Sequence, residues 1–277
     1  MALLLCIETA TAVCSVALAS DGKILSLKES VAKNAHSSVL TVFIEETLQE
    51  AGVDRTGLDA VAVSKGPGSY TGLRIGVATA KGLCYALDKP MIAIGTLEAM
   101  AWGMRNRFTG LGFRGLGFSG LRVKGLGVND IEAGVKRISG ITHELINPEP
   151  LNATRVNQVI FCPMIDARRM EVYSAIFDDS GKQVRETRAE IIREDSFTEY
   201  PGQHTVVFAG DGAQKSRPLL ERNPKAVILD DFLPSANYMI SLAERKFAAK
   251  EFEDLAYFEP FYLKDFVAGK PHVKGLK

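Results

Sequence analysis

The chain has 277 residues, 46% of them hydrophobic and 24% charged, with 33 basic and 33 acidic side chains. This is the composition of a globular protein that is long enough for two lobes or two small domains. The zero net charge argues against a protein whose main role is to neutralise nucleic-acid phosphates, although it leaves room for a local basic patch.

The four cysteines are scattered, and none forms a C-x-x-C pair: Cys6, Cys14, Cys84 and Cys162. Such cysteines are typical of small buried side chains in a reducing compartment. The first residues lack a basic n-region, and Glu8 interrupts the short apolar run that follows. This pattern predicts neither a signal peptide nor a membrane span, so we expect a cytoplasmic protein.

The N-terminal stretch predicts a meander of three strands followed by a helix. Residues 3–8, 14–20 and 23–29 are β-type runs, and the dipeptide "DG" between the last two is a hairpin signal. The helix, residues 37–51, carries an apolar stripe and a second stripe of Val39 and Phe43. Because one helix rarely buries two stripes in its own core, the second stripe indicates a further neighbour.

A strand over residues 58–64 and a helix over residues 73–87 flank the stretch "KGPGSYTGLRIGVATAKG". It fits neither the P-loop template nor the dinucleotide fingerprint, because its first three glycines are spaced G-x-G-x-x-x-G. A glycine turn before a helix N-terminus can still bind an anion through backbone N–H groups and the helix dipole. The candidate anion-binding residues are Gly66, Gly68, Ser69, Thr71 and Arg74.

Small residues form two ridges on this helix. Gly72, Gly76 and Ala80 recur at a spacing of four, and so do Ala78, Gly82 and Ala86. Each glycine inside a helix costs about 1 kcal/mol relative to alanine, so close packing is a reason to keep it. Packing inside the lobe explains one ridge, and a second ridge indicates a partner. The predicted partner interface is Val39, Phe43, Gly72, Gly76, Ala80 and Gly82.

From Gly110 the chain reads GLGFR, GLGFS, GLRVK, GLGVN, a five-residue repeat that matches neither a helix nor an alternating strand. We interpret it as a surface insertion with a return arm that ends near Asn157. A tolerated tandem duplication and an RNA-contacting Arg/Phe/Gly segment are both open interpretations.

The remainder repeats the opening pattern. Residues 159–191 predict a second strand meander, residues 205–213 a strand that ends in a glycine turn, and residues 234–249 an amphipathic helix. The sequence therefore predicts an N-terminal lobe (1–104), an insertion (105–157), and a second lobe with the C-terminal helix and tail (158–277).

Catalytic signals are weak. The four histidines lack metal-ligand spacing, and no G-x-S-x-G elbow occurs. Glu8 and Asp166 stand at the first turn of each meander and could serve as a base or a metal ligand, but acids that only bond a turn are commoner. We predict no metal site and no catalytic residue.

Several motifs together carry a family likeness: LCIETATAVCSVAL, NAHSSVL, VSKGPGSYTGLRIGVATAKGL, IGTLEAM and CPMIDARRMEVYSAIFD. The chain resembles the TsaB (YeaZ) family, whose members act with TsaD to make threonylcarbamoyladenosine on tRNA. The likeness is close over residues 2–102 and 159–179 and looser elsewhere.

The resemblance implies the actin-like ATPase (ASKHA) fold, an α/β architecture of two RNase H-like lobes with mixed sheets flanked by helices. It implies a non-catalytic subunit that binds TsaD through helices 37–51 and 71–87 and forms a homodimer through them when alone. A TsaE-type ATPase is a further implied partner, and contact with tRNA is indirect. No cofactor is required alone, with ATP or ADP expected only at the heterodimer interface.

Two departures from the family pattern matter. Glu8 stands where members often have Asp, and "ETATAV" lacks the glycines of an actin-like phosphate loop. Both weaken the alternative of an independent ATP-dependent small-molecule enzyme, a kinase or ATPase, of the same fold. The pentad insertion is not part of the family pattern, and nothing in the sequence supports the older glycoprotease label.

Overall fold

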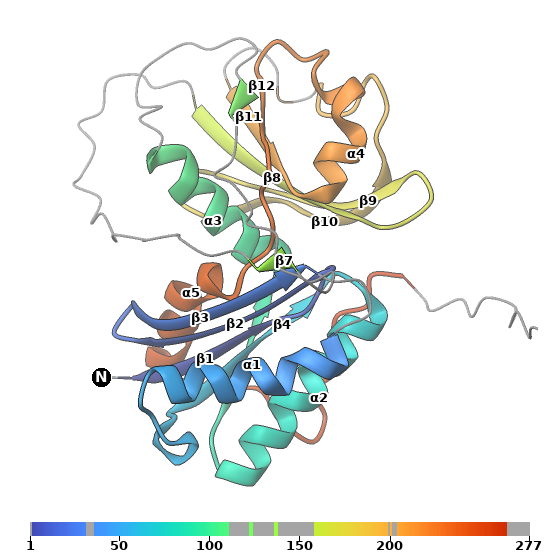
Figure 1. Cartoon of the computed structure of the whole chain (residues 1–277). Helices are drawn as coiled ribbons and strands as arrows, with labels where there is room; N and C mark the ends of the chain where they lie inside the picture. Colours follow the sequence, from blue (N-terminus) through green and yellow to red (C-terminus); the bar gives the residue numbers. More distant parts are fainter. Residues whose placement is uncertain are drawn as a thin grey trace, which may run out of the picture.

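The computed structural model describes residues 2–31, 36–110, 122–123, 136–137, 158–198, 200 and 204–264. Figure 1 shows two lobes, one above the other, each built on a sheet with helices against it. The first lobe holds β1 (Leu3–Glu8), β2 (Val13–Ser20), β3 (Lys23–Val31), α1 (His36–Glu50), η1 (Arg55–Gly57), β4 (Ala60–Gly66), α2 (Tyr70–Leu87) and β5 (Met91–Gly95). The second holds β8 (Gln158–Asp166), β9 (Glu171–Phe177), β10 (Gln183–Ile191), β11 (His204–Ala209), α4 (Asp211–Leu220) and β12 (Ala226–Leu229).

The two sheets repeat one topology. The first has the order β5-β4-β1-β2-β3 and the second β12-β11-β8-β9-β10. In each, a three-stranded antiparallel meander is extended by two parallel strands, β4 and β5 or β11 and β12. The buried strands are rich in valine, isoleucine and alanine, as parallel strands covered on both faces require. The predicted fold class of two mixed sheets flanked by helices is confirmed.

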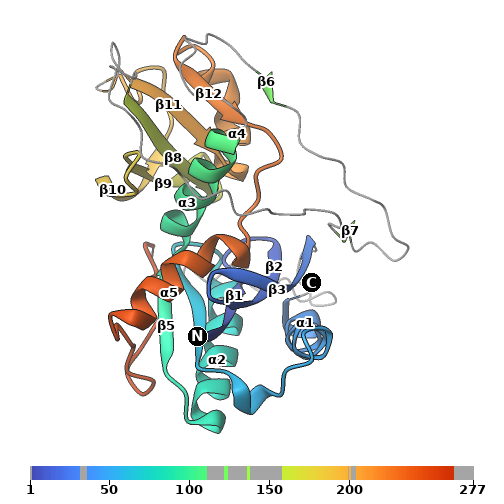
Figure 2. The same cartoon turned by 90° about the vertical axis from the view of Figure 1, so that its left-hand side faces the viewer.

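Both faces of the first sheet are covered, but by helices from different parts of the chain. On one face α1 and α2 pack on β1, β2 and β4. On the other lie η2 (Ala236–Met239) and α5 (Ile240–Ala248), which bury Met239, Leu242 and Ala243. Figure 2 shows α5 and α1 on opposite sides of this sheet. The assignment of the C-terminal helix to the second lobe was therefore wrong, because its apolar face completes the first.

Helix α3 (Thr96–Gly110) lies between the lobes. Leu97, Met100 and Met104 pack in the core of the second lobe, and Ala99 packs with η2 against the first sheet. The helix also runs six residues beyond the predicted boundary at residue 104. The helix therefore packs against both lobes, through a different apolar face on each side.

The insertion contributes one short strand to each sheet. β6 (Arg122–Val123) pairs with β12, and β7 (Lys136–Arg137) pairs with β3. The other residues between 111 and 157, including most of the pentad repeat, lie outside the described residues, as does the basic end of the chain from residue 265. Both interpretations of the insertion stay predictions.

Candidate functional site

Helix α2 begins at the glycine turn. The Ser69 side chain accepts a hydrogen bond from the Gly72 N–H at 3.4 Å, which caps the helix. At the other end, Asp88 takes a left-handed conformation (φ 52°), and its N–H donates to the carbonyl oxygen of Cys84. The helix therefore starts three residues before the predicted Leu73, because a serine cap was available earlier in the chain.

The first small-residue ridge packs on the turn between β1 and β2. A Cβ on Gly72 would lie 2.1 Å from the carbonyl oxygen of Thr9, and one on Gly76 would lie 2.2 Å from Thr9 Oγ1. Thr9 Oγ1 donates to the carbonyl oxygen of Gly72 at 2.9 Å. These glycines thus allow close packing within the lobe, against a strand turn rather than another helix.

The same turn occupies the space in front of the predicted anion site. The Ser69 N–H donates to the carbonyl oxygen of Ala10 at 2.6 Å, and a Cβ on Gly68 would lie 2.3 Å from that oxygen. An anion there would face the carbonyl oxygens of Thr9 and Ala10, which repel it. The structure does bring Gly66, Gly68 and Ser69 together, but it offers an anion fewer donors than the sequence pattern implies.

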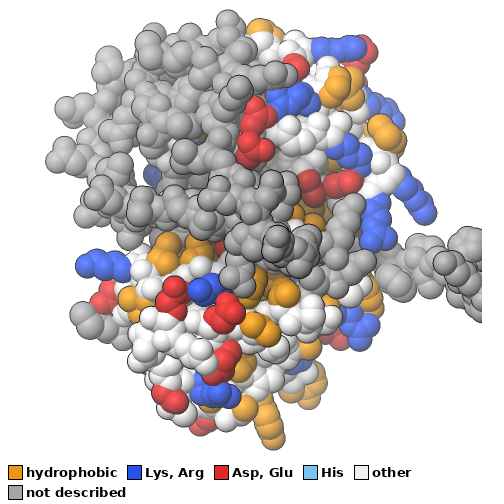
Figure 3. All heavy atoms as spheres, in the orientation of Figure 1, with side chains coloured by type: hydrophobic (Ala, Val, Ile, Leu, Met, Phe, Trp, Pro, Cys, Tyr) orange, Lys and Arg blue, Asp and Glu red, His pale blue; other side chains and the backbone are white. Residues whose placement is uncertain are grey.

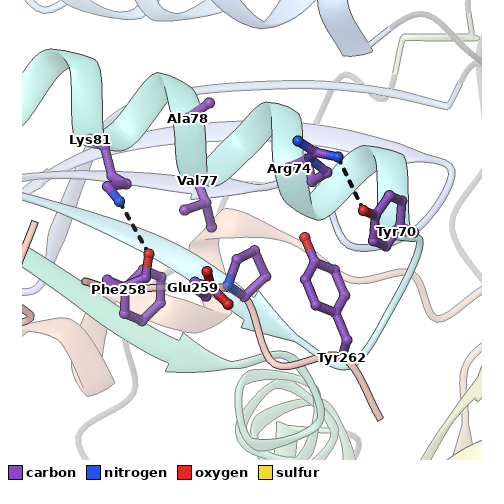
Figure 4. Close-up of a pocket in the computed structure, with 9 residues that line it drawn as sticks. Tyr70, Arg74, Val77, Ala78, Lys81, Phe258, Glu259 and Tyr262 are labelled. Atoms are coloured by element: carbon purple, nitrogen blue, oxygen red, sulfur yellow. Dashed lines mark hydrogen bonds between the residues drawn. The ribbon is translucent and has the colours of Figure 1, made fainter. Parts of the chain in front are cut away.

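The two remaining anion candidates, Thr71 and Arg74, are exposed on the helix. Arg74 Nη1 donates to Tyr70 Oη at 3.0 Å, and its guanidinium lies over the Tyr70 ring, 5.4 Å from the centroid. The arginine is therefore held beside Tyr70, as Figure 4 shows. The anion-binding role of these five residues stays a prediction.

Glu8 is buried at the end of β1, with 1% of its surface exposed. Burial raises its pKa from the usual 4.5 to about 7, although the N–H groups of Ala10 and Thr9 and the Ser64 hydroxyl favour the charged form. Its Oε1 accepts hydrogen bonds from the Ala10 N–H at 2.6 Å and the Ser64 hydroxyl at 3.1 Å. These contacts tie the β1–β2 turn to β4, which is a structural role.

This carboxyl predicts a pH-dependent stability. The folded chain holds the Glu8 proton up to a pKa of about 7, whereas the unfolded chain loses it near 4.5. Stability should therefore fall as the pH rises from 4.5 to 7, by about 3 kcal/mol from this group alone. In Glu8→Gln the amide oxygen can accept the same two hydrogen bonds, so this part of the slope should disappear.

Denaturant unfolding of both proteins at pH 5 and pH 8 measures the difference. Glu50→Gln is a matched control, because hydrogen bonds from Ser26 and Lys28 lower the pKa of the exposed Glu50 carboxyl. Because its pKa lies below the usual 4.5, that replacement should leave the slope between pH 5 and pH 8 unchanged. Equal pH slopes for wild type and Glu8→Gln would show that Glu8 is not protonated in the folded chain.

The second small-residue ridge of α2 faces outward. Ala78, Gly82 and Ala86 are exposed, and a Cβ on Gly82 would meet nothing within 4 Å. Tyr85 stands beside this ridge with 85% of its surface exposed, and Val42 of α1 is 50% exposed. Figure 3 shows hydrophobic side chains reaching the surface over α1 and α2. We call Val42, Ala78, Gly82, Tyr85 and Ala86 the docking face.

The structure divides the six predicted interface residues. Gly72, Gly76, Ala80 and Phe43 are buried in the lobe itself. Gly82 is exposed, and Val39 is half-buried against the core. Of this set, a partner could touch only these last two in the structure as it stands, so the prediction of an interface on α1 and α2 now depends on the docking face.

A groove of about 350 Å³ lies along α2 next to the docking face, with which it shares Ala78 (Figure 4). The helix contributes Tyr70, Arg74, Val77, Ala78 and Lys81, and the C-terminal segment contributes Phe258, Glu259, Pro260 and Tyr262. The rings of Tyr70 and Tyr262 lie 4.8 Å apart. Sequence reasoning missed this wall of the groove, and the aromatic density of "YFEPFY" was the available signal.

Asp166 ends β8 as Glu8 ends β1, but it is partnered in its own turn. Its Oδ1 accepts from Lys215 Nζ at 2.6 Å and from the Arg168 N–H at 2.9 Å. Asp211 Oδ1 accepts from the Asp166 N–H at 2.8 Å.

Within the described ranges, no cluster of three or more His, Cys, Asp or Glu side chains could hold a metal ion. None of the helices described there is long and apolar enough to cross a membrane.

Comparisons with known proteins match this geometry. Residues 28–113, which include α1 and α2, match the family model described as TsaD: tRNA N6-adenosine threonylcarbamoyltransferase. The tRNA threonylcarbamoyladenosine biosynthesis protein TsaB of Escherichia coli is 29% identical over 273 residues, 96% of each chain. The tRNA N6-adenosine threonylcarbamoyltransferase of Erythrobacter litoralis is 44% identical over 75 residues, 27% of this chain and 22% of its own.

The solved structure of YeaZ from Pseudomonas aeruginosa shares the fold, with a TM-score of 0.67 and 23% identity. The alignment covers 95% of this chain and 100% of that one. These findings confirm that the chain resembles the TsaB (YeaZ) family over about 95% of its length, in sequence and in fold.

Proposed function

We propose that the chain is a non-catalytic subunit that binds a TsaD-type transferase and supports the formation of threonylcarbamoyladenosine on tRNA. The family resemblance names the pathway, and the docking face is the structural observation that supports a binding role. Exposed tyrosine is typical of interface hot spots, because its large ring adds contact area at a small cost in side-chain entropy.

The docking face suits a partner helix. Ala78, Gly82 and Ala86 leave a shallow path between larger side chains, and such a path lets a second backbone come close. The face lies within residues 28–113, the region that matches the TsaD model. A TsaD-type protein is expected to carry related helices, so two similar helix pairs could pack against each other.

The remaining parts of the proposal follow from the same resemblance. The chain works in the cytoplasm, pairs with a second copy when TsaD is absent, and reaches tRNA through its partner. A TsaE-type ATPase joins the complex. The chain needs no cofactor alone, and ATP or ADP binds only where the two subunits meet.

Reconstitution tests the proposal. The TsaD-type protein and the other pathway proteins of the host are combined with tRNA, threonine, bicarbonate and ATP, and modified adenosine is measured with and without this chain. We expect product only when the chain is present. Product that is independent of the chain, together with no binding to the TsaD-type protein, would contradict the proposal. Unaided ATP hydrolysis that Glu8→Gln abolishes would favour an independent ATP-dependent enzyme.

A further inference from the structure

The segment that follows α5 crosses from one lobe to the other. We call residues 252–264 the C-terminal strap. It starts at the edge of the first sheet, where the Glu253 N–H donates to the carbonyl oxygen of Met91 at 2.9 Å. It then runs beside α2, where Lys81 Nζ donates to the carbonyl oxygen of Phe258 at 3.1 Å, as Figure 4 shows. Leu255 and Phe258 pack on the core beneath α1 and α2.

The strap forms a backbone hydrogen bond with the first lobe at the end of β4. The Phe261 N–H donates to the carbonyl oxygen of Lys65 at 2.6 Å. Gly66 has φ +111°, and a Cβ there would lie 2.5 Å from the carbonyl oxygen of Phe261. Glycine is therefore needed at this position for two reasons, its backbone conformation and the close approach of the strap.

The next residues of the strap belong to the second lobe. Leu263 packs against the core that α3, β8 and β9 form. Lys264 makes an ion pair with Glu171, and its Nζ donates to the carbonyl oxygen of Ala167 at 3.4 Å. The ammonium also lies 5.8 Å from the centroid of the Tyr173 ring. The ring of Tyr262 still lies beside that of Tyr70 in the first lobe, so contact with the second lobe begins at the very next residue, Leu263.

We propose that the C-terminal strap is a latch that fixes the position of the second lobe relative to the first. Two lobes joined by a few crossing segments move as rigid bodies unless a further contact holds them. A rotation that separates β4 from β8 would have to break the Phe261–Lys65 hydrogen bond or remove Leu263 and Lys264 from the second lobe. The latch does not depend on the proposed function, because all its contacts lie within this chain.

Distances between spin labels on the full chain test the latch. The four native cysteines are buried, and burial raises the thiol pKa of Cys6 and Cys14 to about 12, so introduced surface cysteines will react first. Labels at Thr41→Cys in α1 and Asp179→Cys in the β9–β10 turn report on the two lobes. We expect one narrow distance distribution in the otherwise unchanged chain and a broader or shifted one after Leu263→Ala with Lys264→Ala.

Hydrogen exchange gives a second readout. In the variant with both replacements, exchange of the amides of residues 259 and 261–264 should become about tenfold faster, equivalent to about 1.4 kcal/mol. Tyr257→Ala is the matched control, because this side chain is 85% exposed and lies in the same strap. Glu171→Gln weakens the latch from the other lobe and gives an independent test if the double variant is poorly folded. Folded variants with unchanged distances and unchanged exchange would overturn the proposal.

Discussion

Replacing Gly82 with arginine is expected to weaken binding of the TsaD-type protein about 100-fold, a loss in the range measured for interface hot spots. Gly82 lies in the centre of the exposed ridge, and an added side chain meets no atom of its own chain within 4 Å. The long charged group would fill the path of a partner helix and would lose its hydration there. Titration by calorimetry or biolayer interferometry measures the affinity.

Two further variants distinguish steric blocking of the partner by a large side chain from other effects of replacing residues on this helix. Gly82→Ala should stabilise the helix by about 1 kcal/mol and leave the ridge shallow, so affinity should change little. Tyr85→Ala should weaken binding about tenfold or more, because it removes the most exposed ring beside the ridge. If Gly82→Arg and Tyr85→Ala both bind like the original chain, the partner does not use the docking face.

Gly72→Ala is expected to destabilise the chain by about 4 kcal/mol, an unusually large effect for one methyl group. Its Cβ would lie 2.1 Å from the backbone carbonyl oxygen of Thr9, and relief would require a shift of the β1–β2 turn. Gly76→Ala should cost about 3 kcal/mol, since the atom that it meets at 2.2 Å is the Thr9 side-chain oxygen. Denaturant midpoints at constant slope measure both.

Thr9→Ala distinguishes the two glycines. It removes Oγ1, so it should rescue Gly76→Ala by about 2 kcal/mol in a double-mutant cycle. It leaves the backbone carbonyl of residue 9 in place, so it should not rescue Gly72→Ala. If Thr9→Ala restores the stability of both variants equally, or does not restore that of Gly76→Ala, contact with the β1–β2 turn is not the reason that α2 needs these glycines.

These variants also show what the sequence could and could not predict. The spacing of Gly72, Gly76 and Ala80 correctly indicated a close-packed face, because period and residue size are local properties. It did not identify the neighbour. The turn at Thr9 and Ala10 is more than sixty residues away in the chain, and its approach depends on the pairing of β1 with β4. The structure leaves the second ridge exposed, and its predicted contact with a partner stays a prediction.

Strands and turns were predicted well where they alternate with clear signals. Both meanders and the strand before α2 occur where their patterns place them. The helix predicted over residues 234–249 was only partly correct, because Ala236–Met239 form a 3-10 turn before α5 starts at Ile240. This helix was assigned to the second lobe because it follows that lobe in the chain. It packs on the first sheet instead, and that packing depends on the whole topology.

Sequence reasoning could not predict the position of the strap either, because that position also depends on the whole topology. Its hydrogen bonds to Met91, Lys81 and Lys65 join residues that lie far apart in the chain, and it has no repeating pattern. The resemblance to a family supplied the fold class and the pathway, but not this contact. Long-range pairing of an irregular segment leaves no periodic signature in composition or spacing.

The position of α5 has a consequence for synthesis on the ribosome. The five long strands of the first sheet are complete once Gly95 has been made, but the helix that covers its second face begins only at Ile240. At ordinary translation speeds the ribosome needs roughly 7–30 s to make the intervening chain. During that interval Leu4, Cys6 and Ala62 lack their native cover, so the nascent first lobe exposes an apolar surface that chaperones can bind.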